Sequence, residues 1–475
     1  MMPNSFQYIF FLVLAAGGHA LCPKKGRNIF LLAVSWLFYL LSMPKYLPLM
    51  IVVTALTWKC GQVMEQRPKQ KRAVLTAALL GCFGLLFVYK YLGFAAELIS
   101  MLPVAGVIEV PQLVQPLGIS FYLFCVTGYL IDVYRGAAAE QSIVDYSLMV
   151  SFFPAVLSGP IARSKDLLPQ LKERRVYWMD MKRGVTRFLV GLAKKMLLAD
   201  VLSALVAAVY ADVSAFTGTQ VLFATVCYAL QIYCDFSSYS DMAVGAGLLF
   251  GIRLQENFDA PYFAQSIQEL WRRWHMSLSG WFRDYLYFPL GGSRKGALRT
   301  NLNLLIVFAV SGLWHGAGLQ YLVWGLLHGG YQVIGRLVRP VTKPIREKID
   351  ASPLAIVAKW ARICWVFGLT NIAWVFFRAE SVGHAVAIFR RIVTLGGIGG
   401  AEAFGMVPMQ LMLLGGCLLA LFVWDLTYKK YDLVERLAHC VWLRYFVWTV
   451  LILLVLCFGS YGTGYNAAEF VYFQF

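Results

Sequence analysis

The chain has 475 residues, of which 59% are hydrophobic and 14% are charged, and this balance excludes an ordinary soluble domain. It carries 42 Lys and Arg against 25 Asp and Glu, which gives a formal net charge of +17. The basic residues cluster in short connecting segments, as is typical of the cytoplasmic side of a membrane protein, so they require no nucleic-acid partner. We therefore predict an all-α polytopic membrane protein with about ten to twelve membrane segments, some of them re-entrant.

The apolar run at the N-terminus precedes its basic residues, Lys24, Lys25 and Arg27, which is the reverse of a cleavable signal peptide. We expect a retained first span with the N-terminus outside. Basic clusters predict cytoplasmic loops at residues 24–27, 67–72, 163–195, 253–299, 336–348 and 429–430. Because the stretches between them are long enough to cross the membrane, we expect a single membrane domain over residues 1–475.

Cysteines and two aspartates lie inside the apolar runs. The ten cysteines form no C-x-x-C pair and no cluster with histidine at metal-ligand spacing, so we expect no disulfide framework and no metal site. The chain has no G-x-S-x-G, H-E-x-x-H, Walker or G-x-G-x-x-G motif. Asp235 and Asp241 lie in YCDFSSYSDM within a long uncharged stretch, where a carboxylate either serves function or pairs with hydroxyls and helix ends.

Residues 263–292 predict an amphipathic helix that lies in the cytoplasmic interface or is tilted into the bundle from it. Ser266 and Glu269 form a capping box at its start, and Pro289 ends it. Apolar residues repeat on one face at spacings of three and four, and they are Trp271, Trp274, Leu278, Trp281, Tyr285 and Phe288. At 100° per residue, His275 falls within this apolar sector, about 40° from Trp271.

The 36 residues 300–335 contain no Lys, Arg, Asp or Glu, and SGLWHGAG (311–318) lies near their middle. If Arg299 and Arg336 both face the cytoplasm, the chain enters the membrane and returns within this run. Residues 301–313 would give about 20 Å of helix, which is short of the roughly 30 Å hydrocarbon thickness. We therefore predict a re-entrant hairpin whose turn lies inside the membrane, with His315 deep in the membrane and facing a cavity.

An imidazole at that depth is held neutral by burial, and a neutral imidazole is a competent general base. His315 would take the proton of a hydroxyl as the oxygen attacks a thioester carbonyl. His275 would orient the donor or the base, or polarise the carbonyl. The alternative for both is a core histidine that is hydrogen-bonded between helices, and for His328 packing is the expected role.

Six motifs, in this order along nearly the whole chain, resemble the membrane-bound O-acyltransferase family, in particular its bacterial polysaccharide and alginate O-acetyltransferase branch. They are LGISFYLF (117–124), FFPAVLSGPIAR (152–163), YCDFSSYSDMAVG (233–245), ELWRRWHMSLSGWFRDYLYFPLGGSRKG (269–296), SGLWHGAG (311–318) and FVYFQF (470–475). The resemblance implies a bundle of about eleven membrane helices, with re-entrant and interfacial segments around a central funnel.

The resemblance also implies roles for residues. The histidine of the W-H-G motif, here His315, would be catalytic, and that of R-W-H-M-S, here His275, would face the same tunnel. We assign to the tunnel lining Trp274, Ser277, Trp314, Asp235 and Asp241. In residues 461–475, expected outside, Tyr472 occupies the position at which relatives' tails are proposed to accept the acyl group, unless these aromatics form an interfacial belt.

The implied function is transfer of an acetyl group from a cytoplasmic thioester, acetyl-CoA, across the bacterial cytoplasmic membrane to O-acetylate a cell-surface or exported polysaccharide, with no cofactor. Arg272, Arg273 and Arg283 would bind the donor's phosphates, unless they act only as topology signals. The expected partners are membrane lipid and a separate extracytoplasmic transferase of the serine-hydrolase (SGNH) type.

Three alternatives stay open at this point. One is D-alanyl transfer to teichoic acid by the same chemistry. Another is a proton-coupled transporter in which His315, Asp235 and Asp241 form a relay and no acyl bond is made. The third is a scaffold subunit that only recruits enzymes, for which His315 would be dispensable.

Overall fold

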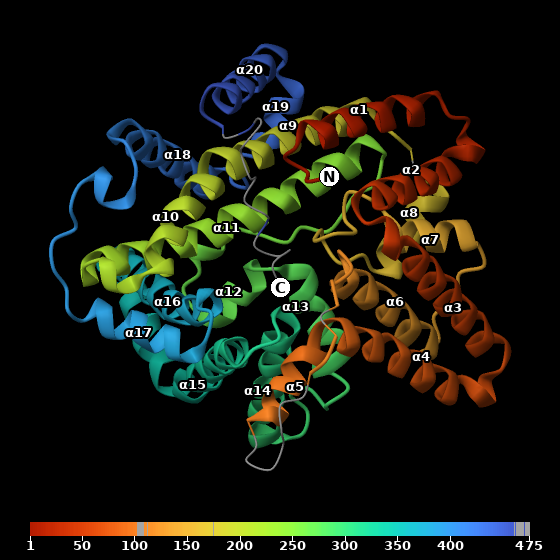
Figure 1. The fold of residues 1–475 in the computed structure, drawn as a ribbon, viewed down its shortest axis with the longest axis horizontal. Helices are drawn as coiled ribbons and strands as arrows, with labels where there is room; N and C mark the ends of the chain where they lie inside the picture. The colour runs from red at the N-terminus through yellow and green to blue at the C-terminus, as the bar shows by residue number, and fades with distance from the viewer. Residues whose placement is uncertain (102–108, 112, 174, 460, 462–469, 471–475) are drawn as a thin grey trace. The chain divides into compact units, whose positions relative to one another are not determined.

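The computed structural model describes residues 1–475 except 102–108, 112, 174, 460, 462–469 and 471–475. The described residues form α-helices α1 to α20, joined by 3₁₀ turns, π turns and irregular segments, and contain no strand (Figure 1). This confirms the prediction of an all-α chain. The helices divide into two compact units along the chain.

Seven helical segments of the described residues are long and apolar enough to cross a membrane. They are Pro44–Gln66, Pro68–Ser100, Gly218–Leu249, Gly296–His315, Ala355–Arg378, Pro408–Thr427 and Val441–Phe458. The apolar helices Phe6–Leu21 and Ile119–Tyr134 have 16 residues each, or about 24 Å, which is less than the hydrocarbon thickness. Length and hydropathy thus support a multi-pass protein, and the higher count of about eleven membrane helices stays a prediction.

The first unit comprises Met1–Gly191 and Tyr239–Glu256. Its helices are α1 (Phe6–Leu21), α2 (Arg27–Ser42), α3 (Leu47–Gln66), α4 (Lys71–Leu86), α5 (Leu92–Ser100), α6 (Ile119–Tyr134), α7 (Ile143–Ser151), α8 (Ser164–Glu173), most of α9 (Trp178–Ala193) and the end of α11 (Gly218–Leu249). Buried aromatic rings form its core, with Phe38 and Phe250 each about 5.7 Å from Phe153, centroid to centroid. Helices α9 and α11 meet closely at Gly184 and Gly245.

The second unit comprises Leu192–Ser238 and Asn257–Phe475. Besides the start of α11 it contains α10 (Asp200–Ala211), α12 (Ile267–Arg273), α13 (Met276–Phe282), α14 (Gly296–His315), α15 (Leu319–Asp350), α16 (Ala355–Arg378), α17 (Val382–Ile392), α18 (Pro408–Thr427), α19 (Leu433–His439) and α20 (Val441–Phe458). Among the predicted site residues, this unit contains His275, His315, Trp274, Ser277, Trp314 and Asp235. Asp241 belongs to the first unit.

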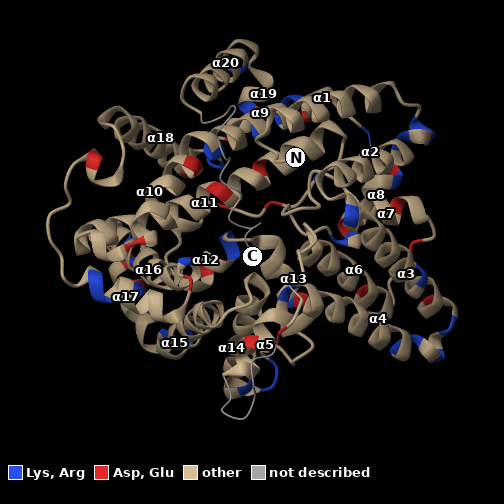
Figure 2. Cartoon of the chain, viewed as in Figure 1, with Lys and Arg blue, Asp and Glu red and all other residues tan. Residues whose placement is uncertain are grey.

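Two basic clusters that were predicted as cytoplasmic loops are largely helical. Residues 163–195 fold largely into α8 and α9, and Arg163 and Lys195 at their ends are buried. Residues 336–348 are the exposed C-terminal part of α15. Figure 2 shows Lys and Arg on helices as well as on connecting loops. The positive-inside rule concerns the side of the membrane and carries no information on secondary structure, so the cytoplasmic location of these clusters stays a prediction.

Helices α14 and α15 form a hairpin joined by residues 316–318. The glycines at Gly312 and Gly325 allow the close packing, because a Cβ at either position would collide with a backbone carbonyl of the other helix, that of Tyr321 or Phe308 respectively. The predicted hairpin is therefore present. However, α14 has 20 residues, or about 30 Å, so the length argument that placed the turn inside the membrane does not hold.

The glycine packing of the hairpin gives a stability prediction. Gly325→Ala is expected to lower the free energy of unfolding by roughly 1–3 kcal/mol, because the new methyl group collides with the Phe308 carbonyl. Gly330→Ala in the same helix is the matched control, since a Cβ there meets nothing within 4 Å, and alanine favours the helix. The midpoint of thermal unfolding in detergent measures both, and equal midpoints would contradict the close-packing account.

Candidate functional site

The segment that carries His275 is not one continuous helix. It forms α12 and α13, which are separated at Trp274 and His275, followed by a π turn over Arg283–Tyr287. His275 has φ 43° and ψ 54°, a left-handed conformation that a helix interior does not contain. The single-helix prediction for residues 263–292 was therefore wrong, because side-chain spacing persists across two short helices and does not reveal the break between them.

The start of the predicted helix is confirmed. The Ser266 hydroxyl accepts a hydrogen bond from the Glu269 backbone N–H at 3.1 Å, as a capping box requires. The Glu269 carboxylate accepts from the backbone N–H of Gln265, one residue earlier than expected, and also binds Arg273 at 2.6 Å. These contacts fix α12 just before the turn at His275.

An extended segment holds the left-handed turn in place. The Asn257 carbonyl accepts from the Met276 N–H at 3.0 Å, and its side-chain oxygen accepts from the Ser277 N–H at 3.2 Å. The N–H of Asp259 donates to the carbonyl of Arg273 at 3.0 Å. Asn257 and Ser277 are themselves buried. Hydrogen bonds on both sides of His275 thus offset the backbone strain and orient its ring.

The structure brings the two predicted histidines together. The His275 and His315 rings lie 6.3 Å apart, centroid to centroid, and both are buried. His315 is the last residue of α14, next to the turn, and Trp324 and Phe377 pack on its ring at 5.1 Å and 5.3 Å. Trp314 contacts both histidines, with centroid distances of 6.1 Å to His275 and 5.0 Å to His315. The result is a histidine pair in an aromatic enclosure.

His275 lies outside the candidate membrane spans, and its burial lowers its pKa from 6.5 to about 3. The ring is therefore neutral throughout the physiological range, and it can donate from one nitrogen and accept at the other. Phe236 of α11 packs edge-on against it, at 4.6 Å between centroids. An apolar neighbour of this kind disfavours the imidazolium, which is the physical cause of the lowered pKa.

This pKa has a measurable consequence for stability. Between pH 6.5 and about 3 the unfolded chain binds a proton at this imidazole that the folded chain excludes, so the free energy of unfolding falls as the pH decreases, by up to about 1.4 kcal/mol per unit. His275→Asn is expected to flatten the decline of the thermal midpoint between pH 7 and 4.5, whereas His439→Asn, at an exposed site, is expected to keep the wild-type slope. Identical slopes for all three proteins would contradict the assignment.

His328 has a packing environment of its own. Its ring is buried, and the Trp271 indole N–H donates to its Nδ1 at 3.3 Å. Trp324 lies between the two hairpin histidines, with centroid distances of 5.1 Å to His315 and 5.2 Å to His328. The arrangement agrees with the packing role expected for His328.

The two acidic residues of α11 pair with cations. Asp235 binds the Lys195 ammonium at 2.6 Å, and Asp241 binds the Arg187 guanidinium at 2.5 Å. Neither cation was predicted as a partner, because residues 163–195 were interpreted as a cytoplasmic loop. One sequence signal could have indicated Lys195. It directly precedes the apolar residues MLLA and lies five residues before Asp200.

The three arginines assigned to the donor differ in their surroundings. Arg273 pairs with Glu269 and Arg283 pairs with Asp284, at 2.6 Å and 2.8 Å, so each has a carboxylate partner within the chain. Arg272 is exposed. Among the predicted tunnel residues, Trp274 is buried and packs on Trp374 at 5.1 Å.

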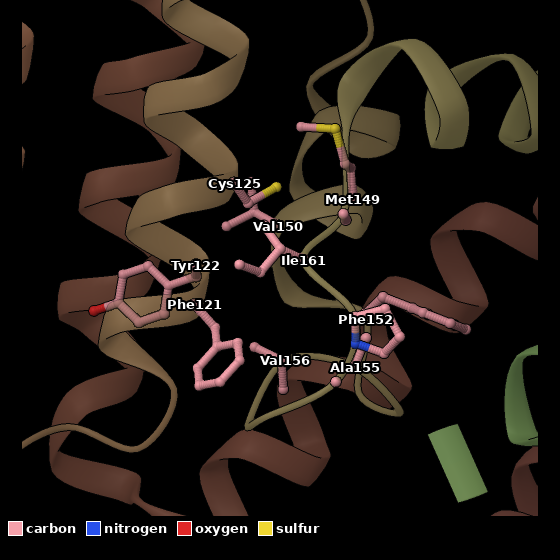
Figure 3. A pocket seen from close by; sticks show the side chains of 12 residues that line it. Phe121, Tyr122, Cys125, Met149, Val150, Phe152, Ala155, Val156 and Ile161 are labelled. Carbon is pink, nitrogen blue, oxygen red and sulfur yellow. The ribbon is translucent and has the colours of Figure 1, made fainter. Parts of the chain in front are cut away.

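Tyr472 lies outside the described residues, as do most of residues 461–475. Phe470 is described, and its buried ring lies 4.1 Å from the Lys195 ammonium. A small cavity of about 20 Å³ in the first unit, between α6 and residues 149–162, is lined by none of the predicted site residues (Figure 3). It has room for about one water molecule.

Comparison with known proteins adds independent evidence. Residues 128–377, which include both histidines, match the family described as MBOAT, membrane-bound O-acyltransferase family. The chain is 36% identical over 400 residues to the probable alginate O-acetylase AlgI of Pseudomonas putida (83% of this chain, 80% of that protein) and 37% over 402 residues to that of Azotobacter vinelandii (83% and 78%). It is 32% identical over 421 residues to the peptidoglycan O-acetyltransferase of Helicobacter pylori (82% and 77%). The chain therefore belongs to the membrane-bound O-acyltransferase family and is a multi-pass membrane O-acyltransferase.

Proposed function

We propose that this protein takes an acetyl group from a cytoplasmic thioester, acetyl-CoA, and passes it across the bacterial cytoplasmic membrane for O-acetylation of a cell-surface or exported polysaccharide. The observation that carries the proposal is the buried pair of His275 and His315, 6.3 Å apart at the end of a helical hairpin. The relatives named as O-acetylases and as an O-acetyltransferase support acetyl as the transferred group.

In the proposed reaction, His315 takes the proton from the Tyr472 hydroxyl as the phenol oxygen attacks the thioester carbonyl. A C–O bond forms and the C–S bond breaks. The leaving thiolate receives the proton from the His315 imidazolium, which leaves an acetyl ester on Tyr472, free CoA thiol and a neutral imidazole. The neutral His275 ring donates a hydrogen bond to the carbonyl oxygen, where negative charge develops.

The remaining parts of the site are proposed from the same resemblance. A funnel through a single membrane domain of about eleven helices leads the donor to the histidines, past Trp274, Ser277 and Trp314. Arg272 is the arginine best suited to the donor's phosphates, because Arg273 and Arg283 already pair with carboxylates. A separate extracytoplasmic transferase of the serine-hydrolase type receives the acetyl group and delivers it to the polymer.

Purified full-length protein incubated with radiolabelled acetyl-CoA tests the proposal. The expected results are release of CoA thiol and label on Tyr472, both dependent on His315. Label transfer from a D-alanyl thioester instead would identify D-alanyl transfer. An absence of transfer from either donor, together with His315-independent surface acetylation in cells, would leave a transporter or a scaffold. The pairing of Asp235 with Lys195 weighs against the transporter, because a relay through this carboxylate would have to disrupt a buried ion pair.

A further inference from the structure

The second unit contains a buried ionic cluster that the proposed reaction does not use. The Lys195 ammonium lies 2.6 Å from the Asp235 carboxylate and 3.0 Å from that of Asp200, and all three side chains are at most 3% exposed. Lys195 lies in the π turn Lys194–Ala199, between α9 and α10. Such turns are uncommon, and they frequently occur at functional sites. Burying these charges is costly, which raises the question of what the cluster binds.

The C-terminal tail contacts this turn at two points. Gly459, which follows α20, is so close to Met196 that a Cβ on it would lie 3.0 Å from the Met196 methyl group. Phe470 returns to the neighbouring residue, where its ring faces the Lys195 ammonium at 4.1 Å. An aromatic face at this distance from a buried cation gives a favourable cation–π interaction. Both ends of residues 459–470 are thus held at one turn.

Helix α11 connects this turn to the histidine pair. Asp235, which binds Lys195, is followed directly by Phe236, which packs on the His275 ring at 4.6 Å. Since consecutive residues of a helix point about 100° apart, one turn of α11 faces both the cluster and the histidines. A tail seated on Lys195 is therefore anchored beside the helix turn that supports His275.

We propose that the Lys195, Asp200 and Asp235 cluster is the docking site of the C-terminal tail, and that Phe470 is the positioning residue that seats the tail there. The proposal rests on the proposed function for the role of Tyr472. In the sequence Tyr472 lies two residues beyond Phe470, and two residues of extended chain span at most about 7 Å, so the proposed docking would keep the tyrosine within reach of this turn. The cluster then acts as an anchor that limits where the acyl-accepting phenol can move.

Two variants of Phe470 separate the cation–π contact from simple apolar packing, in full-length protein reconstituted in lipid nanodiscs. Phe470→Leu removes the ring, whereas Phe470→Trp keeps an aromatic face. For Phe470→Leu we expect faster hydrogen exchange of the amides in residues 460–475. We also expect acetylation of Tyr472 to slow about tenfold with an unchanged KM for acetyl-CoA. Phe470→Trp is expected to retain wild-type exchange and rate.

The outcomes distinguish this proposal from the proposed function. If Phe470→Leu leaves both exchange and rate at wild-type values, or if Phe470→Trp is as impaired as Phe470→Leu, docking through the cation is overturned. If the wild-type protein places no label on Tyr472, the carrier role fails. In that event the exchange rates of the same variants still decide whether the tail docks on Lys195.

Discussion

His315→Gln is expected to lower the rate of acyl transfer from acetyl-CoA by about a hundredfold to ten-thousandfold, which is the range that a general base contributes. Glutamine keeps a polar side chain of similar reach, but its amide cannot take a proton from the attacking hydroxyl. The ring it replaces is enclosed by Trp324, Phe377 and Trp314, so little water can substitute as the base. The measurement is thiol release from acetyl-CoA by equal amounts of folded protein.

The matched control is His328→Gln in the same hairpin. This histidine is equally buried, but it contacts Trp271 and has no role in the proposed reaction. Its replacement is expected to cost some stability and to preserve transfer per folded molecule. If the two variants lose activity to the same extent, the effect reflects packing of the hairpin, and His315 has no special chemical role.

Lys195→Met is expected to lower the free energy of unfolding by about 3–5 kcal/mol, the usual cost of removing one partner of a buried ion pair. Burial alone would lower the pKa of Lys195, but Asp235 and Asp200 outweigh it and raise the pKa above its ordinary value. The cation is therefore charged in the folded protein. Its removal places two carboxylates side by side in a buried site without their shared cation. Thermal unfolding in detergent gives the measurement.

Lys194→Met provides the comparison, because this neighbouring lysine is only half-buried and lies 6.0 Å from the Tyr233 ring. We expect a change of at most about 1 kcal/mol for it. A Lys195→Met and Asp235→Asn double variant is expected to recover part of the loss, since it removes one carboxylate charge as well. Equal midpoints for the two single variants would show that the Lys195 ion pairs contribute little.

The hairpin and its histidine could be predicted because their signals are local. An uncharged run bounded by Arg299 and Arg336 has few ways to fold in a membrane, and the glycines around His315 mark the turn. The capping box at Ser266 could be predicted for the same reason, since it joins residues three positions apart. The location of the turn at membrane depth was less secure, because it depended on where α14 begins, and helix ends are poorly fixed by composition.

The turn at His275 and the partners of Asp235 could not be predicted for a different reason. The left-handed backbone conformation of His275 is stabilised by hydrogen bonds from the following residues to Asn257, 18 residues earlier. No local sequence pattern indicates these hydrogen bonds. The Lys195 and Asp235 pair joins residues 40 positions apart. Local periodicity constrains neither the hydrogen bonds to Asn257 nor the pairing of Lys195 with Asp235. Interpreting Lys195 as part of a cytoplasmic loop also gives no reason to expect it at a buried site. Long-range contacts between polar groups were thus where the sequence was least informative.

The contact between Phe470 and Lys195 also bears on the order in which the protein is assembled. Translation produces Lys195, Asp200 and Asp235 well before Phe470, so the ammonium and its two carboxylates are synthesised before their aromatic cover exists. A chain that ends before Phe470 would therefore leave this buried cation without its aromatic cover.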